Sequence, residues 1–184
     1  MALDALDRFL ETASDRLSWA EVVQNSWGPG APPNGHSDVV AAYHPELTTE
    51  QLLRCYRTMI TSRRVDEREL MLQRQGQAFF SASCAGKEAC LIAAGLVLRP
   101  TDPLWGYYRD RALVLMRGYT PREMLMQSVA AAADPASGGR QMPEHWGSPE
   151  RAIVPYMSPV GAQCIPAAGL AEALAATGKL IGQG

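Results

Sequence analysis

The stretch GRQMPEHWGS, residues 139–148, places an arginine, a glutamine, a histidine and a tryptophan between two turns that carry glycine. Its imidazole, His145, could move a proton near neutral pH or orient a neighbouring group, but a single histidine is more often a hydrogen-bonded structural residue. Arg109 stands beside Tyr107 and Tyr108, where a guanidinium could simply stack on an aromatic ring. Taken one at a time, these residues do not define a reaction.

Motifs for several other kinds of chemistry are missing from the sequence. It contains no Walker loop, no G-x-G-x-x-G, no nucleophile elbow and no H-E-x-x-H. Its four cysteines form no C-x-x-C pair, so we interpret them as reduced thiols of a cytoplasmic protein.

Composition and charge narrow the class of protein further. A chain of 184 residues with 47% hydrophobic residues predicts one domain with an extension. The formal net charge is -2 and the lysines and arginines are scattered, so no basic stripe predicts binding to nucleic acid. The N-terminal segment carries aspartates where a signal peptide has cations, and no apolar run reaches the roughly 18 residues that span a bilayer. We therefore expect a cytoplasmic protein that has no contact with membranes.

The elements that would position these side chains follow from hydrophobic spacing and turn residues. Residues 1–45 are expected to form an amphipathic helix at 3–17 and a linker whose Gly and Pro content is highest at 26–38. Residues 46–184 are expected to form the main domain. The first helix is then an appendage to that domain.

Within the main domain, helices are expected to alternate with short strands. A capping box of Thr48 and Gln51 predicts a long helix reaching toward Gly76. The buried stripe of that helix is expected at Leu52, Leu53, Tyr56, Met59 and Ile60. Further helices are expected at 86–98, where burial should cover most sides, and at 120–134 and 166–177. A short strand is expected at 78–80, and a second strand or an extended segment at 103–110. This alternation predicts an α/β fold.

Five blocks of the sequence, taken together, resemble the alpha subunit of the thiamine-diphosphate-dependent dehydrogenase component of 2-oxo acid dehydrogenase complexes. The blocks stand in the order found in that family: YRTMITSRRVDERELMLQRQG, AGKEA, LRPTDPLWGYYRDRALVLMRG, GGRQMPEHWGS and SPVGAQCIPAAGLAEAL. The resemblance covers residues 52–176. It implies an α/β thiamine-diphosphate-binding fold, oxidative decarboxylation of a 2-oxo acid substrate, and acyl transfer to a lipoyl-bearing acyltransferase component. It also implies a beta subunit, which shares the cofactor, and a homo-oligomeric assembly.

The same resemblance implies roles for individual residues. Tyr108 and Arg109 match the pair that holds the cofactor diphosphate, and a guanidinium suits that role because it grips phosphate oxygens in bidentate fashion. Ser158 and Val160 match residues that contact the aminopyrimidine ring, and many relatives have leucine at the position of Val160. His145 is expected to orient its neighbours rather than to donate a proton.

Further positions match the substrate pocket, the cofactor cleft and an ion site. Phe80 and Tyr107 match residues of the substrate pocket, although both could be core aromatics. Arg140 and Gln141 recur in a loop beside the cofactor cleft. Some relatives bind potassium through a threonine and a glutamine; here Gln163 is present, but Ala162 replaces the threonine, which puts the ion in doubt.

Relatives carry Mg²⁺ on a G-D-G motif and an asparagine that follow the block matching PAAGLAEAL. The sequence ends at KLIGQG, so we expect the metal ligands beyond its C-terminus, and the activating glutamate comes from the beta subunit. By itself the chain should bind thiamine diphosphate weakly or not at all, and it should self-associate. The chain is then either the N-terminal part of an enzyme, possibly an alpha–beta fusion, or a truncated non-catalytic binding or assembly module. A related acetoin dehydrogenase is an alternative, and the choice between pyruvate and a branched 2-oxo acid stays open.

Overall fold

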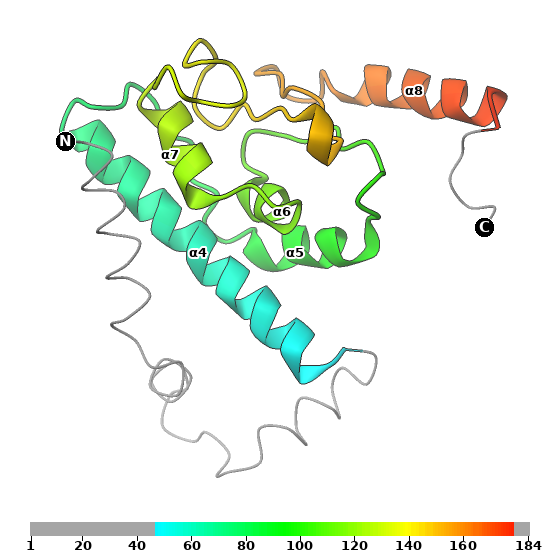
Figure 1. Cartoon of the computed structure of the whole chain (residues 1–184), viewed down its shortest axis with the longest axis horizontal. Helices are drawn as coiled ribbons and strands as arrows, with labels where there is room; N and C mark the ends of the chain where they lie inside the picture. Colours follow the sequence, from blue (N-terminus) through cyan, green and yellow to red (C-terminus); the bar gives the residue numbers. More distant parts are fainter. Residues whose placement is uncertain (1–46, 179–184) are drawn as a thin grey trace. The chain divides into compact units, whose positions relative to one another are not determined.

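The computed structural model describes residues 47–178, and the expected N-terminal helix and linker lie outside this range. Six helical elements follow one another in the described part of the chain, as Figure 1 shows. They are α4 (Thr49–Arg74), α5 (Glu88–Val97), α6 (Arg111–Met116), α7 (Pro121–Ser128), the 3-10 turn η1 (Pro149–Arg151) and α8 (Cys164–Ala176). Among them, no helix is long and apolar enough to cross a bilayer.

The expected capping box opens α4. Thr48 N donates to Gln51 Oε1 at 2.8 Å, and Gln51 N donates to Thr48 Oγ1 at 3.2 Å, so two end groups of the helix are satisfied. The helix ends before Gly76, whose φ of +68° stops it. The buried stripe is not where we expected it, because no residue between 52 and 60 is fully buried. The buried residues of α4 lie later in the helix: Ser62, Val65, Asp66, Glu69 and Leu72.

The short strand expected at 78–80 does not form, and residues 103–110, expected as a strand or an extended segment, contain only an isolated bridge at Leu104; residues 47–178 contain only isolated bridges. Leu104 pairs with Ile153 in parallel, and Ser148 pairs with Ile153 in antiparallel fashion. Ala78 is buried and Phe79 is 93% exposed, but no bridge joins the 78–80 segment to a neighbour within the described residues. The described part of the chain is helix-rich, and it does not confirm the expected α/β class.

Two helices differ from the expectation for local reasons. The short helix α6 was not expected; it begins after a turn in which Asp110 Oδ2 accepts a hydrogen bond from Tyr107 N at 2.8 Å. Helix α7 begins as expected at Pro121 after the N-cap Thr120, which in addition forms a capping box with Glu123. It ends at Ser128 rather than near residue 134, because Ala130 adopts a left-handed conformation (φ +51°).

Helices α5 and α6 pack closely against each other. A Cβ at Gly95 would lie 2.8 Å from Met116 Cβ, so the glycine permits this approach. The start of α5 is tied to α4, because Glu88 accepts a hydrogen bond from Arg63 Nε at 2.8 Å. Only Glu88 and Ile92 of α5 are buried, and Val97 is 79% exposed, so the expectation that this helix is buried on most sides is wrong.

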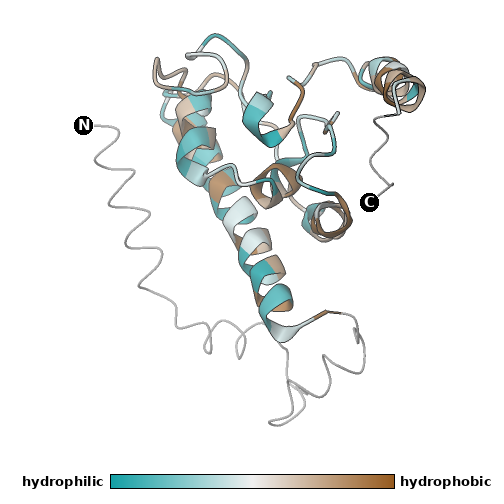
Figure 2. Cartoon of the chain, turned by 45° about the vertical axis from the view of Figure 1, so that its right-hand side comes forward, coloured by the Kyte–Doolittle hydropathy of each residue, from teal (hydrophilic) through white to brown (hydrophobic). Residues whose placement is uncertain are grey.

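The apolar core gathers around the second half of α4, helices α6 and α7, and the loop that precedes η1. Its large members are Val65, Leu72, Ile92, Leu104, Leu113, Val114, Tyr119, Met124, Leu125, Met126, Trp146, Ile153 and Tyr156. Helix α8 contributes no buried residue, although its sequence is largely apolar. Figure 2 shows apolar residues in brown on this helix as well as on the elements of the core.

Candidate functional site

The segment of Tyr107, Tyr108 and Arg109 lies directly before α6, and the core fixes its path. Gly106 contacts the side chain of Tyr156 so closely that a Cβ at residue 106 would lie 2.0 Å from the phenol oxygen. After the segment, Asp110 accepts the backbone N–H of Tyr107 and closes a turn. The two ends of the segment are therefore held, and its side chains occupy defined positions.

The side chains of this segment stack on one another and reach a second loop. The rings of Tyr107 and Tyr108 have centroids 4.0 Å apart, and the guanidinium of Arg109 lies 5.4 Å from the centre of the Tyr108 ring. Arg109 Nη1 also donates to the carbonyl oxygen of Ser83 at 2.6 Å. Arg109 is stacked, as its tyrosine neighbours suggested. Its side chain is half-buried.

His145 lies beside the ring of Tyr108 and contacts Ser158. The two rings stack at 5.8 Å with an angle of 15° between their planes. His145 Nδ1 lies 2.8 Å from the carbonyl oxygen of Pro143, and Nε2 lies 2.7 Å from Ser158 Oγ. Because a carbonyl can only accept, the hydrogen-bond network assigns the proton to Nδ1, and Nε2 accepts the hydroxyl proton of Ser158.

The structure thus brings together four residues that the sequence analysis singled out. We call Arg109, Tyr108, His145 and Ser158 the His145 cluster, and its members come from three separate segments of the chain. Val160 follows Ser158 by two residues and is 76% exposed. Lys87 Nζ lies 5.4 Å from the centre of the Tyr107 ring, on a side chain that the sequence analysis did not consider.

Tyr107 contacts the His145 cluster through Tyr108, but within the described residues no hydrogen bond or ring contact joins the cluster to Phe80, Gln163, Arg140 or Gln141. Phe80 is half-buried, and Gln163 directly precedes α8 after Ala162. The loop of Arg140 and Gln141 is organised by Ser137, whose hydroxyl accepts the backbone N–H of Gln141 at 2.8 Å. In residues 47–178, no group of three or more His, Cys, Asp and Glu side chains could hold a metal ion.

A buried charged cluster of Asp66, Glu69, Arg111 and Glu144 lies behind the site. Arg111 is fully buried and pairs with Asp66, with Glu69 and, at 3.2 Å, with Glu144. Asp66 Oδ2 also accepts the hydroxyl of Ser83 at 2.5 Å. Because the carbonyl of Ser83 accepts from Arg109, the buried charged cluster is connected with the His145 cluster.

Burial sets the protonation of the buried charged cluster. It raises the pKa of Glu69, and together with the charge of Glu69 it raises the pKa of Glu144 to about 8. Burial is the largest single effect on Arg111 and disfavours its charged form, but the acidic groups around it, with Glu69 first among them, together outweigh burial and raise the pKa of the guanidinium. Burial also raises the pKa of the neighbouring Cys84 thiol to about 12. One arginine therefore faces three carboxyl groups, of which that of Glu144 is largely protonated near neutral pH.

The sequence analysis missed this buried charged cluster, although one signal pointed to it. Asp66 and Glu69 share a helix face with Val65 and Leu72, so two acids stand at the spacing of buried positions. Acidic residues at such positions are buried only when a cation pairs with them. The identity of that cation, Arg111, depends on a contact across 45 residues of chain.

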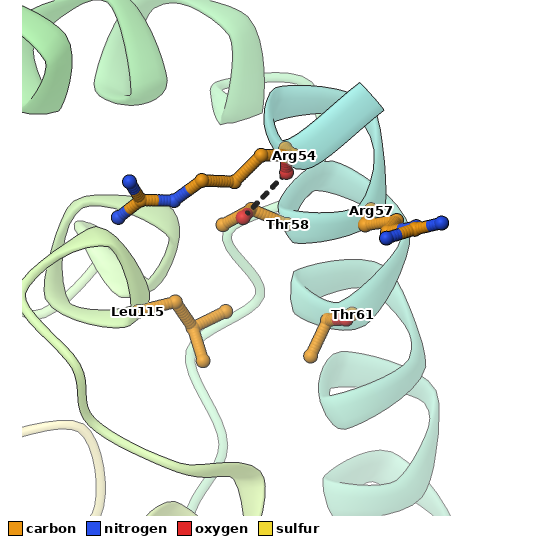
Figure 3. A pocket seen from close by; sticks show the side chains of 5 residues that line it. All are labelled: Arg54, Arg57, Thr58, Thr61 and Leu115. Carbon is orange, nitrogen blue, oxygen red and sulfur yellow. Dashed lines mark hydrogen bonds between the residues drawn. The ribbon is translucent and has the colours of Figure 1, made fainter. Parts of the chain in front are cut away.

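A separate pocket lies between α4 and α6, and Figure 3 shows its lining. The pocket encloses about 200 Å³ and is lined by Arg54, Arg57, Thr58, Thr61 and Leu115. Arg54 extends across the pocket in the figure, whereas Arg57 points away from it. None of the residues expected at a functional site lies in this pocket.

Comparison with known proteins agrees with the arrangement of the five sequence blocks. The model of the family described as "Dehydrogenase E1 component" matches residues 56–181. The chain therefore belongs to the dehydrogenase E1 component family, as the sequence blocks indicated.

Curated relatives give the names of individual members. A 2-oxoisovalerate dehydrogenase subunit alpha of Bacillus subtilis is 44% identical over 128 residues, which are 69% of this chain and 39% of that protein. The protein of the same name from Pseudomonas aeruginosa is 35% identical over 79% of this chain and 35% of its own length. The mitochondrial subunit of Homo sapiens is 33% identical over 70% of this chain and 29% of its own length. The chain thus spans less than two fifths of the length of these relatives.

Proposed function

We propose that the chain is part of the alpha subunit of a thiamine-diphosphate-dependent dehydrogenase that oxidatively decarboxylates a branched-chain 2-oxo acid. Family membership supports this activity, and the names of three relatives support a branched substrate over pyruvate. The proposal includes a beta subunit as partner, an oligomeric enzyme, and a lipoyl-bearing acyltransferase component as acceptor of the acyl group.

The His145 cluster is the observation that carries the proposal. Arg109 and Tyr108 would bind the diphosphate, since Arg109 offers a guanidinium that is held by Ser83 at its back and stacked on Tyr108. Ser158 and Val160 would contact the aminopyrimidine ring, and His145 would orient Ser158 through the bond of 2.7 Å. Tyr107 and Phe80 would line the substrate pocket.

Bound thiamine diphosphate would supply the carbon nucleophile and the electron sink that 2-oxo acids need in order to lose CO₂. The residues of this chain would bind and orient the cofactor from one side. The beta subunit would supply the contacts on the other side of the cofactor. We assign Mg²⁺ to none of the side chains described. A potassium ion near Gln163 would lack an oxygen ligand at Ala162.

The proposal also covers the domain, the fold class and the location of the protein. Residues 46–184 would belong to a thiamine-diphosphate-binding domain, and residues 1–45 would form an extension of it. The complete domain would have the α/β fold, in which the helices described here cover a sheet. The reduced cysteines favour a cytoplasmic location.

A titration of thiamine diphosphate into the chain, with Mg²⁺ and a beta subunit of such a complex present, tests the proposal. Binding is followed by ³¹P NMR, which also detects weak complexes. Arg109→Ala should weaken binding by more than about tenfold, because one charge-assisted hydrogen bond is worth about 2 kcal/mol. Arg64→Ala is the matched control, since Arg64 forms an exposed ion pair with Glu67 on α4.

The outcome separates the two classes of function. Equal binding by the wild type and Arg109→Ala would remove Arg109 from the site. Absence of binding by the wild type would count against the dehydrogenase and would favour a binding or assembly module.

A further inference from the structure

Glu144, the residue before His145, has an unusual backbone conformation. Its φ is +61°, in the left-handed region that residues with a side chain rarely adopt. Such a conformation persists only where surrounding contacts hold it. The angle φ of Glu144 sets the orientation of the peptide group between Pro143 and Glu144. The carbonyl oxygen of that peptide group, which belongs to Pro143, accepts the hydrogen bond of His145 Nδ1. The conformation of Glu144 therefore decides where the partner of His145 lies.

The carboxyl group of Glu144 supplies the contacts that hold this conformation. Its Oε1 accepts the backbone N–H of Ala82 at 2.8 Å and lies 3.2 Å from Arg111 Nη2. The side chain is buried, and Arg111 is itself fixed by Asp66 and Glu69 of α4. The turn before His145 is thus fastened to two other segments through one side chain.

We propose that Glu144 is a positioning residue of the site: its carboxyl group fixes the left-handed turn that sets the tautomer of His145 and its hydrogen bond with Ser158. The role of Glu144 in cofactor binding rests on the proposed function, whereas the contacts of Glu144 and His145 do not depend on a cofactor. Glu144 is not among the residues to which the proposed function gives a role.

The protonation of Glu144 is part of the same arrangement. The groups that face it are Arg111 from α6, Glu69 and Asp66 from α4, and Cys84 from the loop. Burial, followed by the charge of Glu69, raises its pKa from 4.5 to about 8, so the carboxyl group is largely protonated at neutral pH. Since the folded pKa lies above the unfolded one, this contribution to stability is lost as the pH rises from about 4.5 to about 8. Deprotonation then adds a negative charge beside Glu69, and the repulsion between the two carboxylates opposes the contacts of Glu144 with Ala82 N–H and Arg111, which themselves favour the charged form.

The test is NMR spectroscopy of the histidine rings in the 184-residue chain labelled with ¹⁵N-histidine. The sequence has three histidines, so the His145 signals are assigned with His36→Gln and His44→Gln variants. For the wild type at pH 7, we expect a protonated Nδ1 and an unprotonated Nε2 at His145. This pattern should change as the pH passes 8.

Variants at residue 144 separate the carboxyl group from the backbone. Glu144→Gln keeps an acceptor oxygen and imitates the protonated acid, so it should preserve the His145 pattern at pH 7 and remove the change near pH 8. Glu144→Gly suits the left-handed turn but lacks the carboxyl group, so its His145 should sample both tautomers. Glu150→Ala is the control, because Glu150 is an exposed acid close in the chain.

Each result decides the proposal. A wild-type His145 pattern that Glu144→Gly does not alter would overturn it, and so would the same pH dependence in the wild type and Glu144→Gln. If Glu144→Gly does not fold, the comparison of the wild type with Glu144→Gln still decides. Thiamine diphosphate affinity is measured separately, and Glu144→Gly should lower it about tenfold, the usual effect of removing a residue that orients a binding group. The expected ring pattern, without cofactor binding in the presence of Mg²⁺ and a beta subunit, would uphold the role of Glu144 and count against the proposed function.

Discussion

The buried charged cluster and helix α8 show opposite relations between residue type and environment. The cluster places four ionisable side chains in the interior, where each carboxyl group is paired with Arg111. Helix α8 is rich in alanine and leucine, yet none of its residues is buried. A folded chain tolerates the first arrangement because the charges compensate one another within it. The second leaves apolar surface that only another surface can cover.

Of the variants that test this comparison, Arg111→Met should have the largest effect, a loss of unfolding free energy. Removing the cation leaves Asp66, Glu69 and Glu144 buried without their partner, which should cost about 3–5 kcal/mol of unfolding free energy. Urea unfolding of the full chain measures the loss. Arg64→Met, which breaks an exposed pair, should cost less than about 1 kcal/mol. Similar costs for the two variants would mean that the buried charged cluster adds no more stability than a surface pair.

Thiol reactivity should distinguish the two regions next. Cys84 is buried beside Arg111 and its pKa is raised to about 12, whereas Cys164 at the start of α8 is exposed. Because the thiolate is the reactive form, Cys84 should react with iodoacetamide at least about a hundredfold more slowly than Cys164 at pH 8. Timed labelling with mass spectrometry of the peptides measures both rates. In urea the rates should converge, and unequal rates there would point to a cause other than burial.

The smallest expected effect concerns association through α8. Ile165 is 84% exposed, and burying an isoleucine contributes about 2 kcal/mol, so Ile165→Lys should weaken self-association at least about tenfold. Light scattering over a hundredfold dilution measures the change, with Glu172→Gln on the same helix as control. A wild-type chain that is monomeric at every concentration would show that α8 is not covered by a second copy.

Local sequence signals predicted helix ends well and tertiary contacts poorly. The capping box of Thr48 and Gln51 depends on residues three apart, and the helix start at Thr120 depends on the proline that follows it; both form as expected. Helix α6 escaped prediction because its apolar run, RALVLM, is too short to show helical periodicity. The prediction of strands was wrong because a strand needs a neighbouring strand to pair with, and the sequence of a short segment does not specify that neighbour.

The candidate site shows the same division. The residue types of Tyr108, Arg109, His145 and Ser158 were recognised from the order of the sequence blocks. The contact of His145 with Ser158 could not be derived, because it depends on how two loops approach each other. The burial of Glu144 was equally hidden, since a glutamate before a histidine looks like an ordinary surface residue until Arg111 and Ala82 are placed beside it.

The contact of Gly106 with Tyr156 restricts how this chain can change over time. An alanine at residue 106 would overlap the Tyr156 ring, with its Cβ 2.0 Å from the phenol oxygen. A smaller residue at 156, acquired first, would leave a cavity in the core beside Trp146, whose ring lies 5.9 Å away. Either single step is costly, so the two positions are mutationally locked: a descendant sequence must replace both together or keep both. Gly106 and Tyr156, which fix the start of the Tyr107–Arg109 segment, are therefore expected to be inherited together.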